Sequence, residues 1–317
     1  MTAPTFTALI AAYQAADTIA AAIESIQAQT LPAHEIIVVD DGSTDGLSQL
    51  VASRFGSAVD LVRLPENAGR SAAMNRGAAR ATGDFVVLLD ADDVWLPRRL
   101  EAIAAYAEMD PGCDIITTDS YIRIGGEIAG RYYQPDRVVF AQTDQRMAML
   151  VSDFVFGLPA IRNELWRVSG GMDESMRSGA EDYEFLMRLI LTGSRVGLVA
   201  EPLCEYRIRS GSQSRNSTRI VSALDTVYEK ALAHGLTDDE RRVVFQQREH
   251  LRFEARMLEM RKAVWAQDQV VARRLAAEIL TDPAFRKRYR ADALLTLVAP
   301  QLARRRLRPD PDEMPAI

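Results

Sequence analysis

The chain has 317 residues, of which 48% are hydrophobic and 26% are charged, as in an ordinary globular protein and unlike a disordered or fibrous one. A net charge of −6 at pH 7 excludes a protein that binds nucleic acid over its whole surface, so we expect no nucleic-acid partner. The two cysteines, Cys113 and Cys204, lack the spacing of a metal site, which favours a reduced, cytoplasmic protein.

The N-terminal residues contain no basic region followed by a long apolar stretch, so the sequence predicts no secretory signal. No window holds about 18 consecutive apolar residues, the minimum for a helix that spans a bilayer. Insertion into a membrane is therefore not expected.

Strand and helix patterns alternate from the N-terminus to residue 90. Strands are predicted at 6–12, 35–39, 59–64 and 85–90, and helices at 17–29, 47–55 and 70–81. This order predicts an α/β fold with a mostly parallel sheet and helices on both faces.

The pattern is looser after residue 90 and becomes helical after residue 216. The elements predicted here are a helix at 96–108, a strand at 114–118, a hairpin around Gly125-Gly126, a helix at 181–192, strands at 195–199 and 203–208, and helices at 218–234, 238–265 and 267–280. The change in composition predicts two domains, an α/β domain over 1–215 and a C-terminal α-helical extension over 216–317.

Three carboxylates follow the apolar strand that ends at residue 90. Asp90, Asp92 and Asp93 lie where open α/β sheets place their ligands, at the carboxyl end of a strand. Such carboxylates suit a hard divalent cation that is held against a diphosphate. Asp is also a common helix N-cap, so Asp92 or Asp93 can equally begin the next helix. Both interpretations stay open on these residues alone.

Four fragments occur in a characteristic order, namely Leu-Ile-Ala-Ala-Tyr at 9–13, Ile-Ile-Val-Val-Asp-Asp-Gly-Ser at 36–43, Asn-Ala-Gly at 67–69 and Leu-Leu-Asp-Ala-Asp-Asp at 88–93. Together they resemble the family 2 glycosyltransferases, whose catalytic domain has the GT-A fold. The resemblance covers about residues 5–215. It implies an inverting enzyme of polysaccharide or glycoconjugate biosynthesis that moves a sugar from a nucleotide diphosphate sugar, with a UDP-sugar as the expected donor, to a hydroxyl of a glycan or lipid-linked acceptor.

The resemblance also implies where the donor binds. Asp40 ends a strand and can accept a hydrogen bond from a nucleobase, while Tyr13 can lie against the base or be an ordinary core or rim tyrosine. Arg70 can reach the nucleotide or be a surface arginine. The remaining positions of the donor site implied by the motifs are Ala11, Gly69 and Ala91.

The metal and the catalytic base follow from the same resemblance. Asp90 is expected to contact the ribose or support the metal, and Asp92 to coordinate Mg²⁺ or Mn²⁺, which neutralises the charge of the leaving diphosphate. Asp93 is the member most suited to capping a helix. Asp182 is expected to be the general base, with Glu181 beside it to orient the acceptor or tune the base. An acidic first turn is also explained by the helix dipole alone.

The last two residues of the predicted site are arginines. Many relatives carry a His where this sequence has Arg209, and an arginine cannot ligate a metal. Arg207 and Arg209 are therefore expected to contact phosphate oxygens directly, with ordinary surface charge as the alternative.

The C-terminal segment has basic clusters at 286–290 and 304–308 around the apolar run 294–298. Such a pattern suits anionic lipid headgroups and predicts peripheral contact at the inner face of the membrane. The alternative is a solvated face of a helix packed on its domain. No oligomeric state is predicted.

Two other functions remain as rivals. A sugar-nucleotide pyrophosphorylase has a Gly-rich, basic loop after its first strand, and residues 12–16 contain neither glycine nor lysine. A degenerate transferase that serves as an interaction scaffold has no need of Asp40, Asp90, Asp92 and Asp182, all of which are present.

Overall fold

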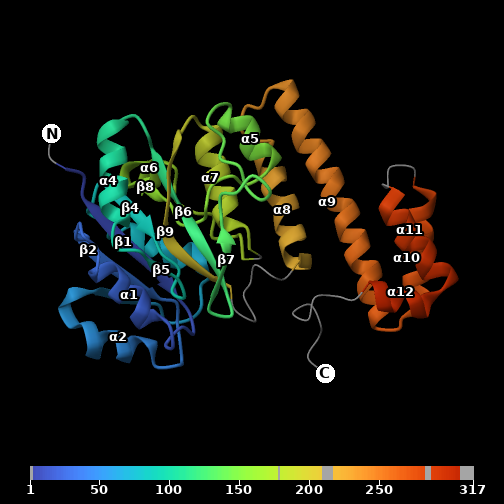
Figure 1. Ribbon diagram of the computed structural model, residues 1–317, viewed down its shortest axis with the longest axis horizontal. Helices are drawn as coiled ribbons and strands as arrows, with labels where there is room; N and C mark the ends of the chain where they lie inside the picture. Colours follow the sequence, from blue (N-terminus) through green and yellow to red (C-terminus); the bar gives the residue numbers. More distant parts are fainter. Residues whose placement is uncertain (1–2, 178, 209–216, 283–286, 308–317) are drawn as a thin grey trace. The chain divides into compact units, whose positions relative to one another are not determined.

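The computed structural model describes residues 3–177, 179–208, 217–282 and 287–307 (Figure 1). The chain divides into two compact units. One, the N-terminal unit, contains residues 1–177 and 181–209, and the other, the C-terminal unit, contains residues 178–180 and 210–317. The boundary predicted within 210–214 lies outside the described residues, so its position stays a prediction.

A nine-stranded sheet forms the centre of the N-terminal unit. Its order is β3-β2-β1-β4-β8-β6-β9-β5, with β7 paired to β6. The strands are β1 Phe6–Ala12, β2 Glu35–Asp40, β3 Asp60–Arg63, β4 Phe85–Leu88, β5 Val94–Trp95, β6 Ile115–Ile124, β7 Glu127–Arg131, β8 Ala160–Arg162 and β9 Val196–Ile208. The first four strands are parallel, as are β6 and β9, whereas β5, β7 and β8 run antiparallel to their neighbours. The predicted α/β class is confirmed, with a sheet that is mixed in its second half.

Seven α-helices belong to the described part of this unit. They are α1 Ile19–Gln27, α2 Leu47–Phe55, α3 Arg70–Ala78, α4 Arg99–Met109, α5 Gln145–Val151, α6 Asn163–Val168 and α7 Glu181–Leu191. From β1 the chain adds β2 and then β3 on one side of β1. It then crosses back and adds β4 on the other side of β1. Right-handed connections therefore place α1 and α2 on one face of the sheet and α3 on the other.

The reversal of strand order at β1 positions the functional site. In open α/β sheets, ligands bind outside the carboxyl ends of the strands at such a switch point. Here the ends of β1, β2 and β4 lead into Tyr13, Asp40 and Asp90. The strands themselves are buried because their apolar side chains do not alternate with polar ones.

Two local expectations are wrong. Helix α4 begins at Arg99 with Arg98 as its N-cap, so neither Asp92 nor Asp93 caps it and the capping interpretation is excluded. The two strands predicted at 195–199 and 203–208 form the single strand β9, because register shifts opposite Pro202 let pairing with β6 continue. The hairpin at Gly125-Gly126 is confirmed, with φ values of 59° and 90° that favour glycine.

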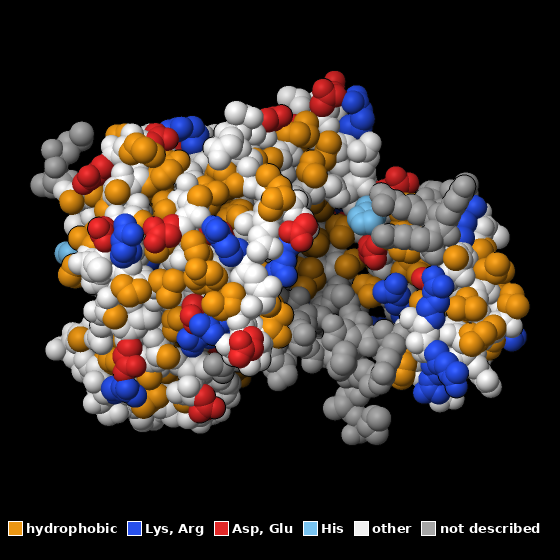
Figure 2. Space-filling view, in the orientation of Figure 1, with side chains coloured by type: hydrophobic (Ala, Val, Ile, Leu, Met, Phe, Trp, Pro, Cys, Tyr) orange, Lys and Arg blue, Asp and Glu red, His pale blue; other side chains and the backbone are white. Residues whose placement is uncertain are grey.

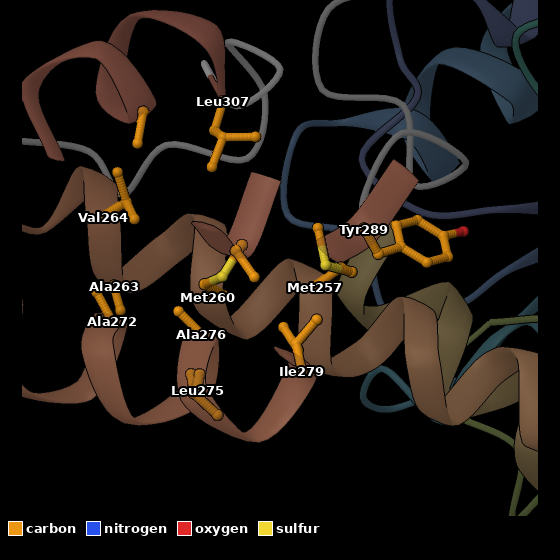
Figure 3. Close-up of a cluster of buried hydrophobic side chains, with 12 residues drawn as sticks. Met257, Met260, Ala263, Val264, Ala272, Leu275, Ala276, Ile279, Tyr289 and Leu307 are labelled. Atoms are coloured by element: carbon orange, nitrogen blue, oxygen red, sulfur yellow. The ribbon is translucent and has the colours of Figure 1, made fainter. Parts of the chain in front are cut away.

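The C-terminal unit is helical, as predicted for that segment. Its helices are α8 Ser217–Ala231, α9 Asp238–Trp265, α10 Gln269–Thr281, α11 Lys287–Val298 and α12 Pro300–Arg306. Helix α9 begins with a capping box in which the Thr237 side chain accepts from the Glu240 amide and the Glu240 side chain accepts from the Thr237 amide. Its far end packs with α10, α11 and α12 around a buried apolar core that includes Met257, Met260 and Ile279 (Figure 3). None of the helices in the described ranges is long and apolar enough to span a bilayer.

Candidate functional site

Arg70 contacts acidic residues from two separate parts of the predicted site, the turn after β4 and the start of α7. It is the first residue of α3, and its Nη2 donates to Asp90 Oδ1 at 3.0 Å, while its Nη1 lies 3.7 Å from Glu181 Oε1 at the start of α7. Burial lowers the pKa of the guanidinium, but the charges of Asp90, Asp182 and Glu181 outweigh burial and raise the pKa overall. The structure therefore brings together the carboxylate after β4 and the acidic start of α7.

The first two residues of α7, Glu181 and Asp182, have different surroundings. Burial raises the pKa of Glu181; Arg70 opposes this effect and Asp182 adds to it. Asp182 Oδ1 accepts from the Tyr183 amide at 2.8 Å. A Cβ on Gly157 would lie 3.1 Å from Asp182 Oδ2. The carboxylate of Asp182 thus lies directly against the backbone of Gly157, where a larger residue would displace it.

A further carboxyl group, which the sequence interpretation missed, lies near Asp182. Burial and the charge of Asp182 raise the pKa of Asp153 to about 8, although Asp153 Oδ1 accepts from the Val155 amide at 3.0 Å. No local motif marks Asp153, which precedes an apolar stretch. Its relation to Asp182 depends on contacts between residues about thirty positions apart.

Aromatic rings form a wall beside this carboxyl pair. The Phe156 ring centroid lies 4.9 Å from that of Tyr132 and 5.9 Å from that of Tyr206. The Tyr133 hydroxyl fixes this segment, since it donates to the Phe154 carbonyl and accepts from the Phe156 amide at 3.0 and 2.9 Å. Because Phe156 precedes Gly157, the wall continues to the carboxylate of Asp182.

The carboxylates after β4 lie in a tight turn. Asp93 is buried and accepts a 2.8 Å hydrogen bond at Oδ1 from the Arg207 amide of β9, and its Oδ2 has no hydrogen-bond partner in the described structure. Burial, followed by the charge of Asp90, raises the pKa of Asp93 well above its usual range. Asp93 therefore ties the turn to β9 in place of the expected helix cap. Asp92 is half-buried beside it, and Ala91 is buried.

Of the two arginines expected to contact the phosphates, the structure describes only Arg207. The Arg207 guanidinium pairs with Glu205, with Nη2 3.1 Å from Oε2, so its charge is engaged within β9. Arg209 lies outside the described residues.

At the end of β2, two adjacent carboxylates organise the loops. Asp40 is fully buried; its Oδ1 accepts from the Ser43 amide at 2.8 Å and its Oδ2 from the Ser48 hydroxyl. Contact of Asp40 with a nucleobase therefore requires one of these bonds to open. Asp41, which was not singled out from the sequence, accepts from the amides of Ala68 and Gly69 at 2.7 and 2.9 Å. The second Asp of the Asp-Asp-Gly-Ser motif was the available signal for this role.

Three further residues predicted to contact the donor, Gly69, Ala11 and Tyr13, lie in or next to the loops that follow the strands. Gly69 is the N-cap of α3 and has a φ of 97°, a conformation that favours glycine. Ala11 is half-buried near the end of β1. Tyr13 is 50% exposed, which excludes a core tyrosine and leaves its ring accessible. Among the described residues, no group of three or more His, Cys, Asp or Glu side chains is arranged to hold a metal.

Comparison with known proteins identifies the family of the chain. Residues 7–166, about half of the chain, match the family described as Glycosyl transferase family 2. The chain belongs to this family, and the resemblance seen in the motifs is confirmed. It is also similar to the succinoglycan biosynthesis protein ExoO of Rhizobium meliloti, with 34% identity over 224 residues that cover 67% of this chain and 63% of ExoO.

Two solved structures resemble the fold of the chain. Residues 1–349 of S. aureus TarS, in complex with UDP-GlcNAc, match with a TM-score of 0.66 and 18% identity over 96% of this chain and 90% of that one. The mannosyltransferase PcManGT of Pyrobaculum calidifontis, in complex with GDP-Man and Mn²⁺, matches with a TM-score of 0.60 and 21% identity over 97% of this chain and 85% of that one. The predicted GT-A fold is confirmed.

Proposed function

We propose that this protein is an inverting glycosyltransferase that transfers a sugar from a nucleotide diphosphate sugar to a hydroxyl group. The observation that carries the proposal is the position of Arg70 between Asp90 and Glu181, because it joins a donor-side carboxylate to the acidic start of α7. A donor that lies at the ends of β1, β2 and β4 then has its sugar near Asp182.

Asp182 acts as the general base in this proposal. Its carboxylate accepts the proton of the acceptor hydroxyl while that oxygen forms a bond to the sugar C1 and the bond from C1 to the diphosphate breaks. Attack from the face opposite the diphosphate inverts the anomeric configuration. Glu181 and Arg70 set the charge around the base, and Gly157 leaves room for its carboxylate.

We propose Mg²⁺ or Mn²⁺ as the cofactor, with Asp92 as its protein ligand and Asp90 in support. Mg²⁺ in such sites is bound by one or two carboxylates together with substrate phosphates, so a complete cage of protein ligands is not required. The unpartnered Asp93 Oδ2 in the same turn fits a site that gains a further group when it is filled. When bound, the ion would neutralise charge on the leaving diphosphate.

The donor and acceptor are proposed from chemistry and from relatives. We propose that Tyr13 and Asp40 contact the base, Asp40 after one of its present hydrogen bonds opens, and that Ala11, Gly69 and Ala91 surround the nucleotide. Arg207, once released from Glu205, and Arg209 are proposed to contact the phosphates. The complex of TarS with UDP-GlcNAc supports a UDP-sugar. The name of ExoO supports a role in polysaccharide biosynthesis, with a glycan or lipid-linked acceptor. We propose that the reaction takes place in the cytoplasm, at the inner face of the membrane.

The test separates donor binding from transfer. Calorimetric titration with UDP and Mn²⁺ should show metal-dependent binding to the wild type and to Asp182→Asn, with dissociation constants within about twofold of each other. Transfer by Asp182→Asn should fall by about 10²- to 10⁴-fold, the usual contribution of a general base. Asp92→Asn should weaken UDP binding in Mn²⁺, and Glu108→Gln, an exposed change on α4, should alter neither property.

Three results would contradict the proposal. Normal transfer by Asp182→Asn would remove Asp182 as the base. Retention of the anomeric configuration in the product, read by NMR, would exclude inversion. A protein that neither binds UDP nor hydrolyses nucleotide sugars would be the interaction scaffold that we consider the main rival.

A further inference from the structure

Helix α11 has apolar side chains on two opposite sides. Tyr289, Ala293 and Thr296 are buried against the rest of the C-terminal unit, whereas Leu294 and Val298 are 53% and 74% exposed. An ordinary surface helix is apolar on one side only, and a helix that is apolar all round is normally covered. The outer side of α11 is therefore an apolar surface that the described residues of the unit leave exposed.

Helix α12, which follows α11 directly in the chain, also has exposed apolar and charged side chains. Leu302 is 56% exposed, and Arg305 and Arg306 on the same helix are exposed as well. We call the exposed set Leu294, Val298, Leu302 and Arg305 the outer face. Figure 2 shows that Lys and Arg side chains lie among hydrophobic ones over this unit.

The charge of this region is opposite to that of the whole chain. Residues 287–307 contain six Lys or Arg residues and a single acid, Asp292, which gives +5 (6 − 1), whereas the chain carries −6. Arg306 Nε lies 2.9 Å from Asp292 Oδ1, so the lone acid is already paired. The following residues 308–317 carry one arginine and three acids and reduce the sum to +3 (5 + 1 − 3).

A cleft adjoins the basic end of the outer face. It has a volume of about 720 Å³ and is lined by Trp265, Arg304, Arg305 and residues around them. The Arg304 guanidinium lies 5.1 Å from the centre of the Trp265 ring. Indole and guanidinium groups are typical of the boundary between headgroups and acyl chains, where one end of a side chain is apolar and the other polar.

We propose that the outer face of α11 and α12 docks the protein on an anionic lipid bilayer. The exposed aliphatic side chains enter the headgroup boundary while the arginines contact lipid phosphates. A second copy of the chain is the less suitable occupant, because a two-fold contact would place two basic faces against each other. The proposed function places the protein at the inner face of the membrane, and the outer face is the surface that would contact the bilayer there. Binding to lipid can be measured without donor or acceptor.

Cosedimentation of the whole protein with vesicles tests the proposal. We expect binding to phosphatidylcholine vesicles that contain phosphatidylglycerol and little binding to phosphatidylcholine alone. Combined replacement of Leu294, Val298 and Leu302 by serine should reduce binding at least tenfold, whereas Val270→Ser, at an 81% exposed valine on α10, should not. Arg305→Glu should reduce binding at least fivefold, and Arg273→Glu on the exposed side of α10 should reduce it less.

Several outcomes would overturn docking on a bilayer. One is equal sedimentation with both kinds of vesicle or with neither. A second is unchanged binding by the triple serine variant when its circular dichroism spectrum matches that of the wild type. Inhibition by millimolar inorganic phosphate at constant ionic strength would indicate a phosphate site in the cleft. A dimer that the serine variant dissociates, without vesicle binding, would identify a second copy as the occupant. Failure of the vesicle test leaves the transferase proposal in place, because UDP binding and transfer are measured separately.

Discussion

The ionisation of Asp153 links one residue to the stability of the whole fold. Its pKa is raised from 3.8 to about 8 by burial and by Asp182. Between these values the folded protein keeps the proton that the unfolded chain releases, so the free energy of unfolding falls as pH rises. The loss from this group is at most about 1.4 kcal/mol per pH unit, is absent below pH 4, and stops growing above pH 8.

We predict that Asp153→Asn removes this loss. The amide oxygen can still accept from the Val155 amide, and the variant carries no charge there. Its melting temperature should exceed that of the wild type by more at pH 8 than at pH 5, because the asparagine has no proton to release on unfolding. Differential scanning fluorimetry at the two pH values measures the difference. An equal gap at both would mean that Asp153 is ionised in the folded protein.

At the residue scale, the sequence allows a site residue to be proposed where a local motif marks it. Asp90 was recognisable because it ends an apolar strand, and the acidic start of α7 because Glu181 and Asp182 follow Gly179. Asp153 and Gly157 could not be found this way. Asp153 is affected by the charge of Asp182, and the backbone of Gly157 lies against the Asp182 carboxylate, only because the folded chain brings distant loops together.

At the element scale, α3 connects the proposed donor side of the site with the segment that leads to α7. Arg70 begins the helix at Asp90, and Asn75 lies one and a half turns further along. Asn75 Oδ1 accepts from the Met172 amide at 2.8 Å, and Nδ2 donates to the Met172 carbonyl at 2.8 Å and to Glu174 at 3.0 Å. One side chain thus holds both backbone groups of a residue in the segment that precedes Glu181 and Asp182, the proposed catalytic acids.

We predict that Asn75→Ala lowers both stability and transfer. Loss of these hydrogen bonds should cost about 1–3 kcal/mol in the free energy of unfolding, because the Met172 amide and carbonyl lose their partners. Freer movement of residues 172–174 should reduce kcat more than it weakens UDP binding. Urea unfolding and steady-state kinetics measure the two effects. The neighbouring exposed Arg76 supplies the control Arg76→Ala, and an equal effect of both substitutions would refute the role of Asn75.

The helices and strands up to residue 90 could be predicted because their apolar residues follow the spacing that is typical of a helix or of a buried strand. Helix α2 was predicted with its observed bounds, and α3 with its first residue. Strand β8 and helices α5 and α6 were not predicted, since they have three to seven residues and lie in a stretch without regular periodicity. The antiparallel pairing of β8 between β4 and β6 is set by tertiary packing, and no local pattern reports it.

At the scale of the whole molecule, the chain divides into two compact units, and the C-terminal unit contains a buried apolar cluster. Among the described residues, this cluster is formed by side chains of α9 to α12 and by Leu307, and it includes Met260, which has no exposed surface. The residues that we propose to bind the donor lie in the N-terminal unit. Stability of the C-terminal unit and binding of UDP should therefore respond to different substitutions.

We predict that Met260→Ala destabilises the C-terminal unit by about 2–5 kcal/mol, because it removes a buried side chain and leaves a cavity. UDP binding at 20 °C should stay within about twofold of the wild type, and vesicle binding should be lost at a lower temperature than in the wild type. Met109→Ala, at a 72% exposed methionine of α4, is the matched control and should change neither. Calorimetric titration measures UDP binding at 20 °C, and sedimentation with vesicles at a series of temperatures measures the loss of lipid binding. Loss of UDP binding together with vesicle binding would show that the two units unfold as one, since a shared core would then carry both activities.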